Sequence, residues 1–68
     1  MDIQVQLIND NKDFQLSLPD SAVAGDSLKE LKIPPDTVII MRNGKPIPID
    51  TPLNNKDKLS LIRVLSGG

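Results

Sequence analysis

KLSLIRVLSGG, residues 58–68, is the segment that says most about how this chain folds. Lys58 to Leu65 is predicted to be the longest strand of the chain. Because side chains alternate across a strand, its two faces carry different sets. The predicted sets are Leu59 and Leu61 on one face, and Ser60, Ile62 and Val64 on the other. Ser66-Gly67-Gly68 then follows with no pattern that would hold it to the domain.

The segment before this strand predicts a hairpin. Val38 to Arg42 is an apolar strand, and Lys45 to Ile49 returns beside it. Between them, Asn43-Gly44 favours a tight two-residue turn, because both central positions of such a turn need positive φ. Pro46 and Pro48 restrict the returning segment to a short edge strand, because proline cannot donate to a hydrogen-bond ladder.

The N-terminal part of the chain predicts a second hairpin. IQVQL (residues 3–7) and FQLSL (residues 14–18) both alternate between apolar and polar side chains. The polar segment NDNK, residues 9–12, is rich in turn-forming residues and joins the two. Pro19 ends the second strand.

The segment from Asp20 to Ile33 is the only helical candidate. Asp20 or Ser21 is predicted to cap its start, and the two prolines directly after Ile33 prevent continuation. Gly25 is unfavourable inside a helix by about 1 kcal/mol relative to alanine. It therefore favours the alternative of a regular helix that begins only at Asp26.

The predicted order of elements is strand, strand, helix, strand, short strand, strand. The simplest two-layer arrangement is one sheet of four to five strands with the helix across one face, an α+β fold. A crossover through the helix allows parallel neighbours, so that the sheet is mixed. The chain of 68 residues leaves no room for a second domain. We expect one domain over residues 1–65 and a flexible tail over residues 66–68.

The composition argues against an enzyme. The chain has no Cys and no His, which removes the thiolate nucleophile, the usual base near pH 7 and the commonest metal ligands. Its four glycines do not form a phosphate-binding loop. With 8 Lys+Arg against 9 Asp+Glu and one Phe as the only aromatic residue, nucleic-acid binding is not expected. No apolar run could span a membrane and no signal peptide is visible, so we expect a cytoplasmic protein.

The Gly67-Gly68 end is the most informative functional feature. A terminal Gly-Gly arises by chance with a probability of roughly 0.5%, given glycine at about 7% of residues. Without Cβ atoms, these residues can enter a tunnel too narrow for others. The α-carboxylate of Gly68 becomes an electrophile once it is joined to the α-phosphate of ATP. We therefore predict that Gly67 and Gly68 form an activation site; the alternative is a frayed end or a cloning remnant.

Three segments carry a resemblance to a known family. Residues 39–48 (IIMRNGKPIP) combine an apolar strand, an Asn-Gly turn and a proline; residues 53–57 are LNNKD; and residues 58–68 are a strand that ends in two glycines. In these segments, and in the order of its elements, the chain resembles the β-grasp sulfur-carrier and ubiquitin-like proteins. These include the thiamine-biosynthesis sulfur carrier, the small subunit of molybdopterin synthase and the small archaeal modifiers. The departures are Lys56, where the family often has glycine, and Asp26-Ser27, where two apolar residues are expected.

The resemblance implies the β-grasp fold and a function that depends on partner enzymes. An adenylating enzyme of the ubiquitin-activating type would adenylate Gly68 with ATP, which is that enzyme's substrate and not a cofactor of this chain. A sulfur donor would then form a thiocarboxylate, and an acceptor enzyme would pass the sulfur to a thiamine or molybdopterin precursor or to tRNA. The alternative fate is attack by a lysine amine, which makes the chain a protein modifier conjugated through Gly68. The free protein would be a monomer.

An apolar set on the terminal strands is predicted to bind a partner. If the helix covers the face with Leu59 and Leu61, a second set points the other way: Ile39, Met41, Ile62 and Val64. We interpret this set as the docking surface for the adenylating enzyme. The alternatives are that the loop from Pro46 to Pro52 folds over it, or that these are scattered surface residues. Three basic residues are interpreted as solvated charge, with docking as the alternative: Arg42, Lys58 and Arg63. A third hypothesis for the whole chain is an interaction module that makes no use of its terminus.

Overall fold

The computed structural model describes residues 1–64 of the chain. Its elements are β1 (Asp2–Leu7), β2 (Lys12–Ser17), α1 (Ala24–Leu31), the 3-10 helix η1 (Pro35–Thr37), β3 (Val38–Arg42), β4 (Lys45–Ile47) and β5 (Lys58–Arg63). The predicted order of strands and helix is confirmed. The end of the predicted domain at residue 65 and the predicted tail at residues 66–68 lie outside the described residues.

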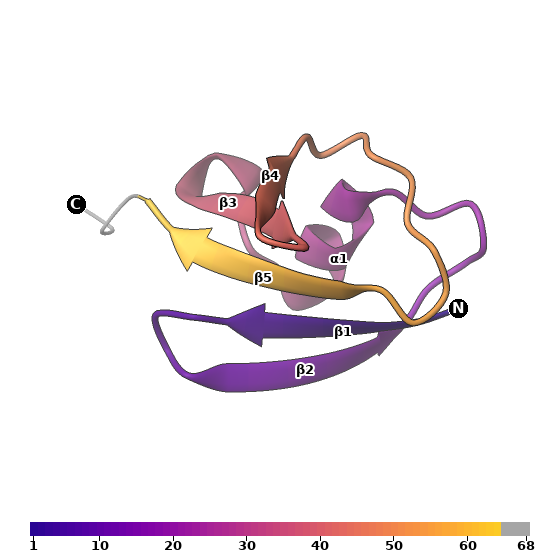
Figure 1. Cartoon of the computed structure of the whole chain (residues 1–68), viewed down its shortest axis with the longest axis horizontal. Helices are drawn as coiled ribbons and strands as arrows, with labels where there is room; N and C mark the ends of the chain where they lie inside the picture. Colours follow the sequence, from indigo (N-terminus) through magenta and orange to yellow (C-terminus); the bar gives the residue numbers. More distant parts are fainter. Residues whose placement is uncertain (65–68) are drawn as a thin grey trace.

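β5 lies at the centre of a 5-stranded sheet with the order β2-β1-β5-β3-β4 (Figure 1). It runs parallel to β1, from Gln4↔Lys58 to Leu7↔Leu61, and antiparallel to β3, from Val38↔Arg63 to Met41↔Ser60. The parallel pair needs a crossover connection, which the chain makes through α1. The outer strands β2 and β4 each form an antiparallel hairpin with their neighbour. The predicted mixed sheet is therefore confirmed, and this arrangement is the β-grasp fold.

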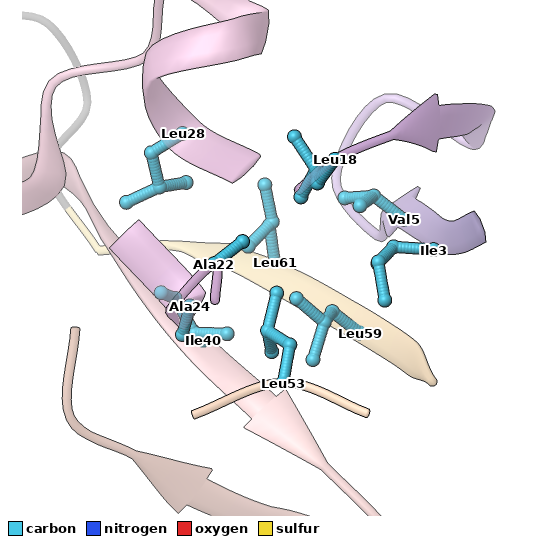
Figure 2. Packing of buried hydrophobic residues seen from close by; sticks show 10 residues of the cluster. All are labelled: Ile3, Val5, Leu18, Ala22, Ala24, Leu28, Ile40, Leu53, Leu59 and Leu61. Carbon is cyan, nitrogen blue, oxygen red and sulfur yellow. The ribbon is translucent and has the colours of Figure 1, made fainter. Parts of the chain in front are cut away.

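The core lies between α1 and one face of the sheet (Figure 2). Buried side chains alternate along the strands, as Ile3 and Val5 do in β1 and Leu59 and Leu61 in β5. Leu28 faces them from α1 and is also buried. The packing is almost wholly aliphatic, and burial of each such side chain stabilises the fold by roughly 1.5–3 kcal/mol.

Helix α1 begins at Ala24, between the two predicted starts. Its N-cap is Val23, whose N–H donates to the carboxylate of Asp26 at 2.8 Å. The prediction that Asp20 or Ser21 caps the helix is wrong. The 8-residue helix is short, and no helix within residues 1–64 is long and apolar enough to cross a membrane.

The first N–H groups of α1 donate to carbonyls of the loop between β4 and β5. Ala24 donates to Thr51 at 2.8 Å, and Gly25 donates to Ile49 at 2.7 Å. A Cβ on Gly25 would lie 3.1 Å from the same Ile49 oxygen, so glycine lets the loop approach closely. A long-range contact thus satisfies helix donors that a local cap would otherwise satisfy.

The hairpin between β3 and β4 has the predicted turn. Asn43 has a φ of 55° and Gly44 a φ of 77°, the positive values that a tight two-residue turn requires. β4 is limited to Lys45–Ile47 and lies at the edge of the sheet. The predicted short edge strand is confirmed.

Candidate functional site

The C-terminal end of β5 is where the sequence places the functional site. In Figure 1, β5 follows the long axis of the molecule and points away from the N-terminus. Arg63 is the last residue of β5, and Val64 is the last residue that the structure describes. The predicted activation residues Gly67 and Gly68 lie outside the described residues. The geometry of the site is therefore that of the surface around Val64.

An apolar surface lies beside the end of β5, on the sheet face opposite α1. Ile39 and Ile62 are directly paired across β3 and β5, and they are 42% and 37% exposed. Met41 lies on the same face, half-buried and paired with Ser60. Val64 follows two residues after Ile62 and is 51% exposed. We call Ile39, Met41, Ile62 and Val64 the β3–β5 surface.

The loop between β4 and β5 packs on the helix side of the molecule. Besides the two carbonyls bound to the start of α1, Leu53 donates its N–H to Ala22 at 3.1 Å and buries its side chain in the core. Pro46 of β4 is paired with Met41. The loop therefore covers the start of α1, and it leaves Ile39 and Ile62 accessible.

Ile8 extends the β3–β5 surface, and sequence reasoning missed it. The N–H of Ile8 donates to Leu61 at 3.1 Å, which continues the parallel ladder by one residue and brings Ile8 level with Ile62. Its side chain is 46% exposed. In the sequence, Ile8 only interrupts an alternating pattern. Its position beside Ile62 depends on the register between β1 and β5, which no local signal contains.

The remainder of the same sheet face is polar. Two shallow hollows of about 330 Å³ each lie over β1, β2 and β5. Their polar lining residues are Asp2, Gln4, Gln6, Asp13, Gln15, Lys56, Lys58 and Ser60. Within residues 1–64, no group of three or more His, Cys, Asp or Glu side chains could hold a metal ion.

Of the three basic residues that the sequence places on the terminal strands, only Arg63 lies at the site, because Arg42 and Lys58 lie toward the start of β5. Arg42 lies 3.0 Å from Asp57, with side chains that are 23% and 19% exposed. Arg63 lies 2.8 Å from Asp10, in a more exposed pair. Arg42 and Arg63 are thus restrained, whereas Lys58 is exposed at the polar hollows.

Comparison with known proteins identifies the family. Residues 1–65 match the family model of small archaeal modifier protein 2. The chain belongs to this family. The match covers the sheet, the helix and every residue of the β3–β5 surface. No curated protein matches the chain.

Solved structures of similar proteins have the same fold. The crystal structure of small archaeal modifier protein 1 from Haloferax volcanii covers 100% of both chains, with a TM-score of 0.77 and 18% identity. The ubiquitin of Caldiarchaeum subterraneum covers 100% of this chain and 98% of its own, with a TM-score of 0.76 and 22% identity. At these identities the likeness concerns the fold, which is that of ubiquitin-like β-grasp proteins.

The two departures from the expected family pattern have structural explanations. Lys56, at the position where the resemblance expects glycine, has a φ of 68°, in the left-handed region that glycine favours. Its N–H donates to Asp2 at 2.7 Å, so the backbone keeps this conformation. Asp26 accepts the cap bond of α1. Ser27 is buried with its hydroxyl donating to Ala24 at 2.6 Å.

Proposed function

We propose that this protein is a sulfur carrier that is activated at the carboxylate of Gly68. The observation that supports activation at this carboxylate, which both candidate functions need, is the family match over residues 1–65 directly before a Ser-Gly-Gly sequence. In the first step, a carboxylate oxygen of Gly68 attacks the α-phosphorus of ATP and pyrophosphate leaves. Hydrosulfide from the sulfur donor then attacks the acyl carbon, a carbon–sulfur bond forms, AMP leaves with one former carboxylate oxygen, and the product is a thiocarboxylate.

The second candidate function is a ubiquitin-like protein modifier. The family's description as a modifier favours it. The same acyl adenylate forms, but a lysine amine of a target protein attacks the acyl carbon, an isopeptide bond forms, and AMP and a proton leave. In both functions the chain is the carried group and the partner performs the catalysis, so we propose that the protein is not an enzyme.

We propose that the β3–β5 surface, together with Ile8, docks the adenylating enzyme. From Val64 to Gly68 there are 68 − 64 = 4 residues, which span at most about 14 Å when fully extended. The nucleotide site of the enzyme therefore has to lie within that distance of Val64. The exposed side chains of Ile39 and Ile62 lie beside this point and offer apolar contact area.

The proposed partners follow from this chemistry. They are an ATP-dependent enzyme of the ubiquitin-activating type, a sulfur donor, and an acceptor enzyme for the thiamine, molybdopterin or tRNA pathway. No nucleic acid, membrane or cofactor takes part directly. Because ATP drives the first step, we propose a cytoplasmic location, with the free protein a monomer.

Incubation with the adenylating enzyme, ATP and a sulfur source tests the proposal. We expect intact-mass analysis to show one oxygen-to-sulfur exchange, and deletion of Gly68 to abolish it. Conjugates whose branched peptides carry a Ser-Gly-Gly remnant would favour the modifier. If deletion of Gly68 leaves every cellular function and interaction unchanged, the chain is an interaction module and the proposal is wrong.

A further inference from the structure

The last residues of β5 are held from both sides by groups outside the regular sheet. On one side, the N–H of Arg63 donates to Asn9 Oδ1 at 2.7 Å, and its guanidinium donates to Asp10 Oδ2 at 2.8 Å. On the other side, the N–H of Val64 donates to the carbonyl of Thr37 at 2.9 Å. These bonds hold the end of β5 to the domain beyond Leu61, which is the last residue of β5 that pairs with β1.

The side chain of Asn9 provides the acceptor for the Arg63 N–H, which lies beyond the pairing between β1 and β5. β1 pairs with β5 only as far as Leu7, and the chain then turns toward β2. In this turn Asn11 has a φ of 51° and donates its N–H to Ile8 at 3.4 Å. The side-chain oxygen of Asn9 reaches the N–H of Arg63, which the backbone of β1 does not reach.

The opposite contact is also built into the fold. Thr37 ends the 3-10 helix η1, and both its N–H, at 3.2 Å, and its hydroxyl, at 2.7 Å, donate to the carbonyl of Pro34. The carbonyl of Thr37 is thereby fixed where Val64 passes. Val64 is thus hydrogen-bonded to a short helix that belongs to the body of the domain.

The contacts with Asn9 and Asp10 are exposed, so they contribute little to the stability of the whole fold. In the Arg63–Asp10 pair the side chains are 47% and 36% exposed, and ion pairs in water contribute little. The Asn9 bond is exposed as well. Their effect is therefore local, because they determine where the backbone leaves the domain.

We infer that Asn9 and Asp10 are positioning residues for activation of the C-terminus. They hold Arg63 in the free protein, while Thr37 holds Val64, so that the adenylating enzyme meets a chain whose point and direction of exit are already set. Ordering a backbone residue costs conformational entropy. A residue that is held before binding does not have to be ordered by the enzyme. This inference rests on the proposed function, which supplies the enzyme.

The test compares Asn9→Ala with Asn9→Asp in the full chain. Asn9→Ala removes the acceptor for the Arg63 N–H, and Asn9→Asp keeps an oxygen in its place. Asp13→Ala is the matched control, because this carboxylate lies on the same hairpin and forms no ion pair within residues 1–64. Two quantities are measured: hydrogen exchange of the Arg63 and Val64 amides by NMR, and kcat/KM for ATP–pyrophosphate exchange with the adenylating enzyme.

We expect Asn9→Ala to speed exchange of the Arg63 amide by about tenfold or more, while amides of the central strands exchange as before. The same variant should lower kcat/KM roughly three- to tenfold, mainly through a higher KM, since the enzyme now has to order Arg63 itself. Asn9→Asp should restore both quantities, and Asp13→Ala should leave both unchanged.

Two results would overturn the inference while the proposed function stands. One is a wild-type protein that is activated and an Asn9→Ala variant that is activated equally well. The other is an Arg63 amide whose exchange does not respond to Asn9→Ala. A wild-type protein that its adenylating enzyme does not activate contradicts the proposed function and the inference together.

Discussion

Lys56 shows how a single residue can be strained without disturbing the fold. Its φ of 68° costs an L-residue other than glycine roughly 1–2 kcal/mol. The conformation persists because neighbours fix the backbone: its N–H donates to Asp2, and Asn55 accepts the N–H of Asp2 at 2.8 Å. The sequence alone points to this strain only through the resemblance, which expects glycine at the position.

Replacement of Lys56 by glycine should stabilise the protein. Glycine relieves the left-handed strain but loses more entropy on folding, so we expect a net gain of about 0.5–1 kcal/mol in the free energy of unfolding. Urea denaturation measures it. Lys58→Gly is the control, because Lys58 lies in β5 and glycine weakens a strand by a similar amount. A loss of stability in Lys56→Gly equal to that in the control would contradict the explanation.

At the scale of elements, the loop between β4 and β5 is fastened to both layers of the domain. Its carbonyls bind the start of α1. The guanidinium of Arg42 donates to Asp57 at 3.0 Å and to the carbonyl of Pro52 at 3.1 Å. Asp57 also accepts the N–H of Asn54 at 2.9 Å. This carboxylate therefore joins β3 to the loop that caps the helix.

Asp57→Ala should destabilise the fold by about 1–3 kcal/mol, because it removes the charged partner of a half-buried guanidinium, which keeps only the Pro52 carbonyl, and the acceptor of a backbone N–H. Asp10→Ala removes an exposed ion pair instead and should cost less than about 1 kcal/mol. The loss of stability in each of the two variants is measured by thermal unfolding. Equal losses in both variants would show that Asp57 does not fasten the loop.

The elements differ in how well the sequence predicts them. Alternating side chains predict the strands, and Asn43-Gly44 predicts its turn, because these signals are local. The start of α1 could not be found in this way. The carbonyls that bind its first N–H groups come from Ile49 and Thr51, far along the chain. Local capping signals at Asp20 and Ser21 were misleading for that reason.

At the scale of the whole molecule, the sheet has two unlike faces. One packs against α1, and the other is exposed and divided between the β3–β5 surface and the polar hollows. Period-two alternation predicts which residues of β3 and β5 share this exposed face. It does not predict that Ile8 joins Ile62 across the parallel pair, because strand order is a long-range property.

Replacing Ile39 and Ile62 together by glutamine should impair docking and spare the fold. Both side chains are partly exposed, and loss of two apolar contacts at an interface should raise the KM of adenylation roughly tenfold or more. Ile49→Gln is the control: this isoleucine is 52% exposed but lies in the loop between β4 and β5, against Gly25 of α1 and away from the β3–β5 surface. The test is the KM of adenylation, measured for variants whose stability has been checked. An equal rise in KM for the control would show that general surface hydrophobicity is responsible.

Intact-mass analysis of the protein purified from its native cells, with sequencing of the last peptide, tests most directly whether the carboxyl terminus of Gly68 is the reactive group. We expect a polypeptide that ends at Gly68, with part of the population carrying sulfur in place of one carboxylate oxygen or joined to another protein through that residue. A mature polypeptide that extends past Gly68 in every form would contradict the proposed chemistry.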